Sequence, residues 1–347
     1  VRDSGGMTTP PVIELHGCLA DIAEQGARRA AIEVSSHALA QGRVDGVRFD
    51  TALFTNMSRD HLDFHTDMRD YFESKARLFT DCEPVHRVVN IDSDYGLQLA
   101  TRCGPDVVTV STSFDKVANG RPYLFVRSVV AGDSGSEVAF VSSWGNGRFE
   151  LHLPGDFNVA NAALVLALLL MKGVPLEQAC DLMSQLQAPP GRMQRVATDG
   201  PAVFVDYAHT PIALEGALRA LRAHCRGQLW CVFGCGGDRD RGKRPQMGKA
   251  AERQGDHVVI TTDNPRAEDP RAIIDDVLAG LEHPQQSTVI EDRAAAIAWA
   301  VGNAAENDVV LVAGKGHEDY QEINGERIAF SDYGVAMQAL SARGGAQ

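Results

Sequence analysis

The chain has 347 residues, which exceeds the usual size of a single domain, so we expect two domains. Its 33 basic and 46 acidic residues give a net charge of −13, which disfavours nucleic acid or an anionic membrane surface as a partner. No apolar run approaches the roughly 20 residues of a membrane-spanning helix, and residues 1–11 lack the apolar core of a signal peptide.

Short apolar runs alternate with helical or loop segments in the first part of the chain. We expect four of these runs to be strands: 30–34, 51–54, 85–91 and 107–110. This alternation is typical of an α/β domain.

Three more apolar runs, 123–130, 137–141 and 149–153, follow without helices between them. Gly-rich turns separate them, including Gly145-Asn146-Gly147, so the sequence predicts an antiparallel ribbon attached to the sheet. Residues 158–171 then predict a buried helix. We place the linker to the second domain at the Ala-Pro-Pro-Gly segment 188–191, because prolines and glycine interrupt regular structure.

The second part of the chain repeats the alternation of strands and helices. Its predicted strands are 203–205, 229–233, 258–260, 288–290 and 309–312. Four of them end in polar or Gly-rich loops, which begin at Asp206, Gly234, Asp263 and Gly314. Since ligands of open parallel sheets bind outside the carboxyl ends of the strands, we expect these loops to converge on one crevice. The pair Asn324-Gly325 predicts a late hairpin, and 331–342 predicts a closing helix.

The seven cysteines are scattered, odd in number and without paired CxxC spacing. This pattern is typical of reduced thiols in a cytoplasmic protein. Cys231 and Cys235 flank a glycine-rich loop, and we interpret them as strand and loop filler rather than as metal ligands.

The loop after the run 258–260 has the chemistry of an amino-acid site. Arg266 could clamp a carboxylate with its planar set of donors, while Asp263 and Asn264 offer acceptors to an ammonium group. The alternative is a helix-capping loop with a solvated arginine.

Acidic and imidazole side chains follow the first two predicted strands. Glu33 ends the first strand, and Asp60-His61 comes a few residues after the second. Carboxylate and imidazole groups at neighbouring strand ends suit Mg²⁺ or Mn²⁺ beside phosphate oxygens. Helix caps and ordinary surface histidines are the alternative. Lys75 has the sequence context of a solvated helix lysine.

Other polar residues allow a nucleotide or anion site. Asp156 and Asn158 open a helix, and helix capping alone explains them. Arg192 follows the linker and Asp206 ends a strand, so both could face a nucleotide across the domain boundary. A basic cluster after the glycine-rich loop suits a phosphate or carboxylate, with a solvated positive loop as the equal alternative. Its members are Arg239, Arg241, Lys243 and Arg244.

Taken together, these segments resemble the Mur ligase family, most closely its diaminopimelate-adding branch. The matching stretches are EVSSHAL, FTNMSRDHLDFH, YFESK, GDFNVANA, PPGRMQ, VDYAHTP, FGCGGDRDRGKRP, TTDNPRAEDP and AGKGHEDYQ. They cover nearly the whole chain in family order. The resemblance implies an α/β fold with two domains: a central ATP-binding domain over 1–189, with a parallel sheet and an antiparallel ribbon, and a Rossmann-like amino-acid-binding domain over 190–347.

The resemblance also implies an activity in peptidoglycan precursor synthesis. The γ-phosphate of ATP would activate the D-glutamyl carboxylate of UDP-N-acetylmuramoyl-L-alanyl-D-glutamate as an acyl phosphate. The amine of meso-diaminopimelate would then attack this acyl phosphate and release phosphate. ATP and Mg²⁺ are the implied cofactors, and we expect a cytoplasmic monomer.

Roles for single residues come from the same resemblance. Lys75 and His209 are the implied catalytic residues, and Glu33, His61 and a carbamylated Lys75 would hold magnesium. The implied ATP contacts are Asn158, Arg192 and Asp206. The UDP-muramoyl peptide would contact Thr8, Thr9, Ser35 and Arg43. The amino acid would contact Arg239, Asp263, Asn264, Arg266, Gly314 and Glu318. The ligand L-lysine has no second carboxylate. Its binding would leave a buried arginine of the site unpaired, which disfavours lysine relative to diaminopimelate.

The chain departs from the family near its first residues. It contains no G-x-x-x-x-G-K-[ST] phosphate loop, and Gly5-Gly6 is followed by Met7, where the family usually has asparagine, and two threonines. We therefore expect an N-terminally truncated chain that is inactive, or nearly so, on its own. A folylpolyglutamate synthetase-like amide ligase and a non-catalytic amino-acid-binding protein are the alternatives.

Overall fold

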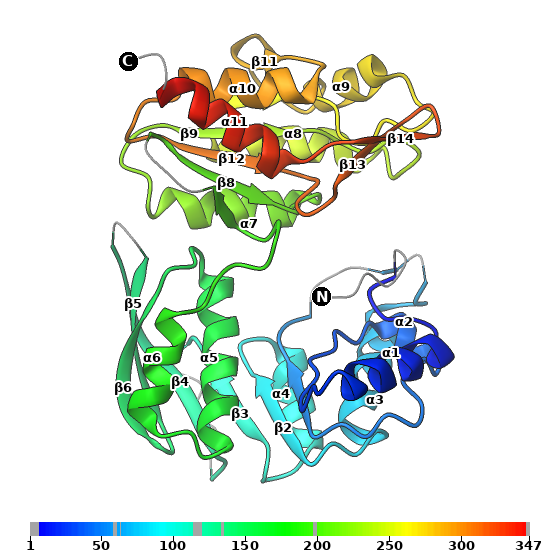
Figure 1. Ribbon diagram of the computed structural model, residues 1–347, viewed down its shortest axis with the longest axis vertical. Helices are drawn as coiled ribbons and strands as arrows, with labels where there is room; N and C mark the ends of the chain where they lie inside the picture. The colour runs from blue at the N-terminus through cyan, green and yellow to red at the C-terminus, as the bar shows by residue number, and fades with distance from the viewer. Residues whose placement is uncertain are drawn as a thin grey trace. The chain divides into compact units, whose positions relative to one another are not determined.

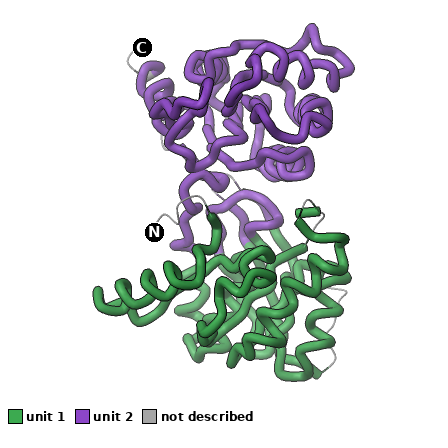
Figure 2. Tube along the Cα trace, turned by 90° about the vertical axis from the view of Figure 1, so that its right-hand side faces the viewer, with its two compact units in different colours: residues 1–129, 138–149, 159–183 green, residues 130–137, 150–158, 184–347 purple. Residues whose placement is uncertain are grey.

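The computed structural model describes residues 7–57, 61–62, 64–113, 120–132, 135–196 and 200–344. The chain forms two compact units, coloured separately in Figure 2. Unit 1 comprises Val1–Val129, Val138–Phe149 and Val159–Met183, and unit 2 comprises Val130–Glu137, Glu150–Asn158 and Ser184–Gln347. None of the helices in the described ranges combines the length and the apolar character needed to cross a lipid bilayer.

The first sheet has six strands, in the order β1-β2-β3-β4-β5-β6 (Figure 1). β1 (Thr51–Phe54), β2 (His86–Asn90), β3 (Val108–Ser111) and β4 (Tyr123–Ala131) pair in parallel. β5 (Ser136–Ser142) and β6 (Gly145–Leu151) complete the sheet as a ribbon. The helices of this part are α1 (Val12–Glu24), α2 (Ser36–Ala40), α3 (Met68–Thr80), α4 (Asp94–Arg102), α5 (Asp156–Met171) and α6 (Leu176–Ser184).

Apolar packing explains most of these elements. Phe54 of β1, Phe72 and Phe79 of α3 and Leu99 of α4 share one buried core. α5 is the predicted buried helix, with apolar residues on nearly every side and seven of its side chains buried. Such a helix is stable only when other elements cover it.

Two predictions for the first sheet are wrong. Segment 30–34 is not a strand, because a strand needs a ladder partner and 30–34 pairs with no described strand. Gly145-Asn146-Gly147 is not a turn: it begins β6, and the turn lies at residues 143–144. A Cβ atom at Gly147 would lie 2.9 Å from Cζ of Phe140, so this glycine provides space for a ring in the neighbouring strand.

Unit 2 contains a second six-stranded sheet, with the order β11-β10-β9-β12-β8-β7. Its strands are β7 (Gln194–Val196), β8 (Ala202–Asp206), β9 (Leu229–Phe233), β10 (His257–Ile260), β11 (Thr288–Val289) and β12 (Val309–Ala313). All pairs are parallel except β7 with β8. The five predicted strands of this half are confirmed.

Helices cover both faces of this sheet (Figure 1). α7 (Pro211–Arg222), α8 (Lys243–Gln254) and α9 (Pro270–Leu278) share a core with Leu311 of β12. α10 (Arg293–Asn303) and α11 (Asp332–Gly344) share another with Val310 and Val312, which the alternation of a strand points to the opposite face. A short 3₁₀ helix, η1 (Pro284–Gln286), precedes β11. This doubly wound arrangement is the expected Rossmann-like fold.

The late hairpin is also confirmed, as β13 (Tyr320–Ile323) and β14 (Glu326–Ala329). Asn324 and Gly325 have φ angles of 52° and 80°, the positive values that a two-residue turn of this type requires. The closing helix is α11.

Candidate functional site

The four loops singled out in unit 2 lie side by side, because β10, β9, β12 and β8 are consecutive neighbours in the sheet. Backbone hydrogen bonds join them. Gly237 N–H donates to the Asn264 carbonyl at 2.9 Å, and Gly314 N–H donates to the Asp206 carbonyl at 3.1 Å. The predicted convergence of the loops is therefore confirmed.

Arg266 is held by the β13–β14 hairpin and the glycine-rich loop. Its φ of 53° lies in the left-handed region, which costs a residue with a side chain about 1 to 2 kcal/mol. Its N–H donates to the Glu322 carbonyl at 3.0 Å, and its own carbonyl accepts from Asn324 N–H at 2.7 Å. The guanidinium donates to the Gly237 carbonyl at 2.7 Å and lies 3.5 Å from Oε2 of Glu322. These contacts position the side chain rather than leave it solvated.

The helix-capping alternative is correct for the end of this loop, where Asp269 caps α9 by accepting from Arg271 N–H, but its solvated arginine is wrong, because the Arg266 side chain is only 21% exposed and has protein partners. Asp263 is buried beside Gly314. Burial raises the pKa of the Asp263 carboxyl, while Arg293 and Lys315 oppose that change. A Cβ atom at Gly314 would lie 2.5 Å from Oδ2 of Asp263, and the φ of Gly314 is 118°. The position therefore requires glycine.

Arg239 is the exposed member of the pocket. It lies next to Gly236, where an added Cβ would be 3.0 Å from Nη1 of Arg266 and 3.7 Å from Cγ of Arg239. The side chains of Arg266 and Arg239 therefore both lie next to Gly236, on the side where its Cβ atom would be.

The rest of the basic cluster has internal partners. Arg244 is fully buried and pairs with Glu268 at 2.8 Å and Asp276 at 2.9 Å. Arg241 also pairs with Asp276, and Lys243 donates to the carbonyl of His209 at 3.1 Å. Among the described residues, Arg239 has one hydrogen-bond partner, the Asp238 carbonyl at 3.3 Å from its Nη1, so its guanidinium keeps donors for an anion.

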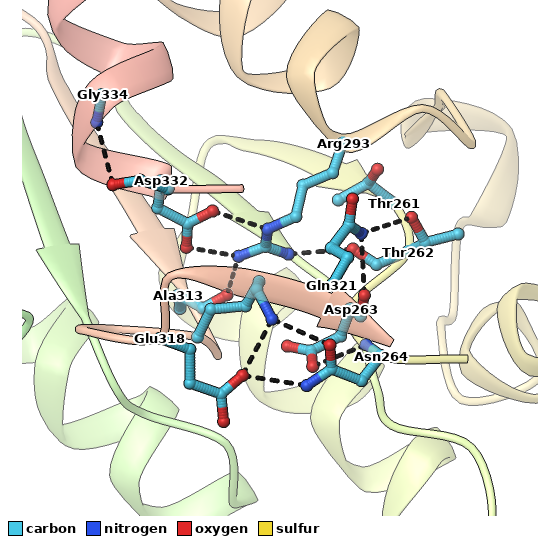
Figure 3. Close-up of polar contacts among 12 residues, drawn as sticks. Thr261, Thr262, Asp263, Asn264, Arg293, Ala313, Glu318, Gln321, Asp332 and Gly334 are labelled. Carbon is cyan, nitrogen blue, oxygen red and sulfur yellow. Dashed lines mark hydrogen bonds and ion pairs between the residues drawn. The ribbon is translucent and has the colours of Figure 1, made fainter. Parts of the chain in front are cut away.

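Glu318 and Asn264 lie side by side (Figure 3). Nδ2 of Asn264 donates to Oε2 of Glu318 at 2.9 Å. The Lys315 ammonium, which the sequence did not single out, donates to Oδ1 of Asn264 at 2.9 Å and to Oε2 of Glu318 at 2.8 Å. The signal in the sequence is its place between two glycines directly after an entirely apolar strand, where a solvated lysine is unusual.

Arg293, which begins α10, supports the same loops (Figure 3). It donates to the carbonyls of Thr262 at 3.0 Å and Ala313 at 2.9 Å, the residues just before Asp263 and Gly314. Its Nε and Nη2 atoms donate to the two carboxylate oxygens of Asp332, each at 2.7 Å. Sequence reasoning missed this residue because it lies in α10, outside the loops.

Two of the predicted nucleotide residues, Arg192 and Asp206, lie at the next strand along, β8, whereas Asn158 lies at the start of α5. The Asp206 carboxylate accepts from Met193 N–H at 2.7 Å and Ala208 N–H at 2.8 Å, and burial raises its pKa. The Arg192 guanidinium lies 4.6 Å from the ring centre of Tyr207. Asn158 donates to the Pro154 carbonyl at 2.8 Å, which accounts for one of its amide protons.

Aromatic rings connect these residues to the 314–318 loop. The Tyr207 ring lies 4.7 Å from the exposed His209 and 5.6 Å from His317. Sequence reasoning singled out neither Tyr207 nor His317. The two rings are tilted by 37° to each other, the Tyr207 ring lies beside Arg192, and aromatic rings of this kind are surfaces on which a planar base stacks.

Unit 1 contains a cavity of about 1700 Å³. Its lining includes six of the predicted residues: Thr8, Glu33, Ser35, Arg43, His61 and Lys75. The His61 ring lies 5.6 Å from that of Tyr71, and the Lys75 ammonium lies 5.4 Å from the same ring. The structure therefore brings together residues predicted to bind metal and residues predicted to bind substrate.

Thr9 differs from its neighbours because it is fully buried. Its hydroxyl donates to the Glu33 carbonyl at 2.8 Å and accepts from Ser35 N–H at 3.1 Å. Arg43 donates to the Thr9 carbonyl at 2.9 Å. In this structure Thr9 organises the segment that carries Glu33 and Ser35, and its contact with substrate stays a prediction.

The acidic and imidazole groups of unit 1 fit magnesium only in part. Among the described residues, no three His, Cys, Asp or Glu side chains converge as a metal site. His65 is occupied elsewhere, since its Nε2 lies 2.9 Å from the Ser36 hydroxyl and its Nδ1 3.4 Å from Asp70. One carboxylate and one imidazole in the cavity are compatible with an ion that takes most of its ligands from phosphates and water.

Comparison with known proteins gives matches over both parts of the chain. Residues 3–169 match the family model of the Mur ligase middle domain, and residues 191–316 match the Mur ligase glutamate ligase domain. The UDP-N-acetylmuramoyl-L-alanyl-D-glutamate--2,6-diaminopimelate ligase of Pseudomonas putida is 47% identical over 98% of this chain and 69% of its own length. The ligase of the same name from Haemophilus influenzae is 44% identical over 96% of this chain and 68% of its own length. The chain thus spans about two thirds of these relatives.

Solved structures give the same result. A structure of a ligase with that name has a TM-score of 0.68 at 38% identity, over 96% of this chain and 69% of that one. Mycobacterium tuberculosis folylpolyglutamate synthase, complexed with ADP, has a TM-score of 0.59 at 21% identity, over 78% of this chain and 61% of that one, which shows a shared fold alone. Since the family models match most of the chain and the relatives exceed 40% identity, the chain belongs to the Mur ligase family.

Proposed function

We propose that the chain belongs to an enzyme that adds meso-diaminopimelate to UDP-N-acetylmuramoyl-L-alanyl-D-glutamate at the expense of ATP. The observation that carries the proposal is the convergence of Asn264, Arg266 and Glu318 at neighbouring strand ends of unit 2. The relatives named above carry the same activity in their names.

The chemistry of this pocket suits an amino acid with a second carboxylate. The Arg266 guanidinium has one donor engaged by the Gly237 carbonyl, which leaves further N–H groups for a carboxylate. Arg239 adds a second guanidinium, and Glu318 supplies an acceptor for an ammonium group. Lysine would leave the arginines without their anion, at a cost of about 1 to 3 kcal/mol.

We further propose that residues 190–347 form the amino-acid-binding domain and residues 1–189 the ATP-binding domain. Asn158, Arg192 and Asp206 would contact ATP, with His209 beside them. In the unit 1 cavity, Thr8, Thr9, Ser35 and Arg43 would contact the UDP-muramoyl peptide. Glu33, His61 and a carbamylated Lys75 would hold magnesium, which when bound neutralises charge on the transferred phosphoryl group.

A cytoplasmic monomer is the setting that we propose. All seven cysteines are free thiols in the structure, which supports a reducing compartment.

Ligand binding to the purified chain tests the amino-acid site. Calorimetry should show binding of meso-diaminopimelate and at least tenfold weaker binding of L-lysine and L-glutamate. Equal affinity for lysine would contradict the role of the arginines, and a preference for glutamate would favour the folylpolyglutamate synthetase-like alternative.

Catalysis needs a separate assay. The sequence predicts little turnover by these 347 residues, because they contain no phosphate loop of the G-x-x-x-x-G-K-[ST] type. Diaminopimelate-dependent release of phosphate from ATP at ordinary enzyme rates would contradict that prediction.

A further inference from the structure

The Lys315 ammonium is buried between two loops of the proposed amino-acid pocket. Its side chain is fully inaccessible to solvent, and it lies between Gly314 and Gly316, which both have positive φ angles. A buried ammonium is costly unless its protons are satisfied. Here two oxygens accept at 2.8 and 2.9 Å, and the Tyr320 ring centre lies 5.4 Å away. Two of the three ammonium protons thus have oxygen acceptors, and the charge lies within cation–π distance of the Tyr320 ring.

Lys315 is one of three partners that fix the orientation of the Asn264 amide. The two ends of an asparagine amide have nearly the same shape, so their placement follows from their partners. Oδ1 accepts from Lys315 at 2.9 Å and from Glu322 N–H at 2.9 Å, and both partners can only donate. Nδ2 donates to the Glu318 carboxylate, which can only accept. In a flipped amide, Nδ2 would face the two donors and Oδ1 would face the Glu318 carboxylate, so all three hydrogen bonds would be lost.

The lysine also occupies one side of Glu318. Oε2 accepts from both Lys315 and Asn264, whereas Oε1 accepts from none of the residues that the structure describes. The Glu318 side chain is 21% exposed, so Oε1 remains accessible to a ligand. One carboxylate oxygen thus serves the protein, and the other is available for an ammonium group.

We propose that Lys315 is a positioning residue that sets the specificity of this pocket. It holds the Asn264 amide with one Nδ2 proton on Glu318 and the second free for a ligand carboxylate, and it directs Oε1 of Glu318 toward a ligand ammonium. The pocket then selects an amino acid whose distal carbon carries both groups. The inference rests on the proposed function for the identity of the ligand, and on geometry alone for the orientation of the amide.

A purely structural role would give a different result. Loss of a buried cation lowers the stability of the protein. If stability were the only role of Lys315, its loss would lower the affinity for every ligand to the same extent. A positioning role weakens mainly the ligand that has a distal carboxylate, because an Asn264 amide without its bond from Lys315 no longer holds its second Nδ2 proton firmly toward that carboxylate. The ratio of two affinities therefore separates the roles.

The main experiment measures binding of meso-diaminopimelate and L-lysine to the 347-residue chain and to Lys315→Met. We expect the affinity for diaminopimelate to fall about 10- to 100-fold, the loss of a hydrogen bond to a charged group, with a change of less than threefold for lysine. Arg327→Met is the matched control, since Arg327 lies 4.4 Å from the other partner of the lysine, the Tyr320 ring, and is exposed. It should preserve both affinities. An unchanged ratio in folded Lys315→Met would overturn the proposal.

A second measurement needs neither a folded variant nor a ligand. In the NMR spectrum of the wild-type chain, the Nδ2 protons of Asn264 should show a stronger nuclear Overhauser effect to the γ-protons of Glu318 than to the Glu322 amide proton. The opposite order of intensities would show a flipped amide and overturn the proposal. Failure of wild-type binding to diaminopimelate would instead contradict the proposed function and leave this measurement as the test of the amide orientation on which the proposal rests.

Discussion

Arg293 and Asp332 form a two-point ion pair that is closed to solvent on both sides. Nε of Arg293 lies 2.7 Å from Oδ1 of Asp332, Nη2 lies 2.7 Å from Oδ2, and both side chains have an exposed fraction of 0%. Because the same guanidinium also binds the Thr262 and Ala313 carbonyls, the pair joins α10 and α11 to the strands that carry the proposed site.

Replacement of Arg293 by Met should destabilise the protein by about 3 to 5 kcal/mol, because Asp332 would remain as an unpaired buried charge. Urea unfolding measures the change. The double variant Arg293→Met/Asp332→Leu should recover much of the loss, since it removes both charges. The exposed pair of Arg271 and Asp275 gives the control, and Arg271→Met should cost less than about 1 kcal/mol. Equal losses in the two single variants would contradict the prediction.

Gly314→Ala should be strongly unfavourable. The added Cβ would lie 2.5 Å from the Asp263 carboxylate, at a φ of 118° that alanine rarely adopts. We expect a loss of about 1 to 3 kcal/mol in the free energy of unfolding, together with weaker diaminopimelate binding. Gly302→Ala is the matched control in α10, where an added Cβ has no neighbour within 4 Å. Alanine should raise helix stability there by about 0.5 to 1 kcal/mol. A neutral Gly314→Ala variant would show that the loop can relax.

Arg266→Lys tests the planar donor set while keeping the charge. Lysine cannot bind the Gly237 carbonyl and a ligand carboxylate with a fixed fork of donors, so we expect about 10- to 100-fold weaker binding of diaminopimelate. Calorimetry measures the affinity, with Arg271→Lys on the exposed face of α9 as the control. Retained affinity would mean that a point charge suffices at this position.

The Glu268 carboxylate should make stability sensitive to acid. The hydrogen bond from Arg244 lowers its pKa to about 2, from 4.5. Since the folded-state pKa is depressed, its contribution is complete above pH 4.5 and is lost as the pH falls from 4.5 toward 2. Melting temperatures across that range should fall less steeply for Glu268→Gln than for the parent chain. Parallel curves would contradict the assignment.

The strands that sequence reasoning placed correctly share one physical property. β9 and β12 are entirely apolar and entirely buried, so a short run with polar loops at its ends was sufficient to locate them. The loop of residues 263–266 was found for a related reason. Asp263 and Arg266 follow the apolar run 258–260 and carry chemistry that a connecting turn does not need.

The residues that sequence reasoning missed depend on partners far along the chain. Lys315 meets Asn264 across 51 positions, and Arg293 meets Asp332 across 39. Neither partner is indicated by the residues that adjoin Lys315 or Arg293 in the sequence. The error at 30–34 has the same origin, since β propensity cannot show whether a partner strand is present.

The amino-acid sequence by itself determined the alternation of elements, the Asn-Gly hairpin and the family of the chain, because periodicity, turn chemistry and motif order are local properties. Only the tertiary structure decided which loops meet, which of the basic residues have internal partners and which way the Asn264 amide points. Those outcomes depend on burial and on hydrogen bonds between distant segments, which form only when the sheet of unit 2 brings its strand ends together.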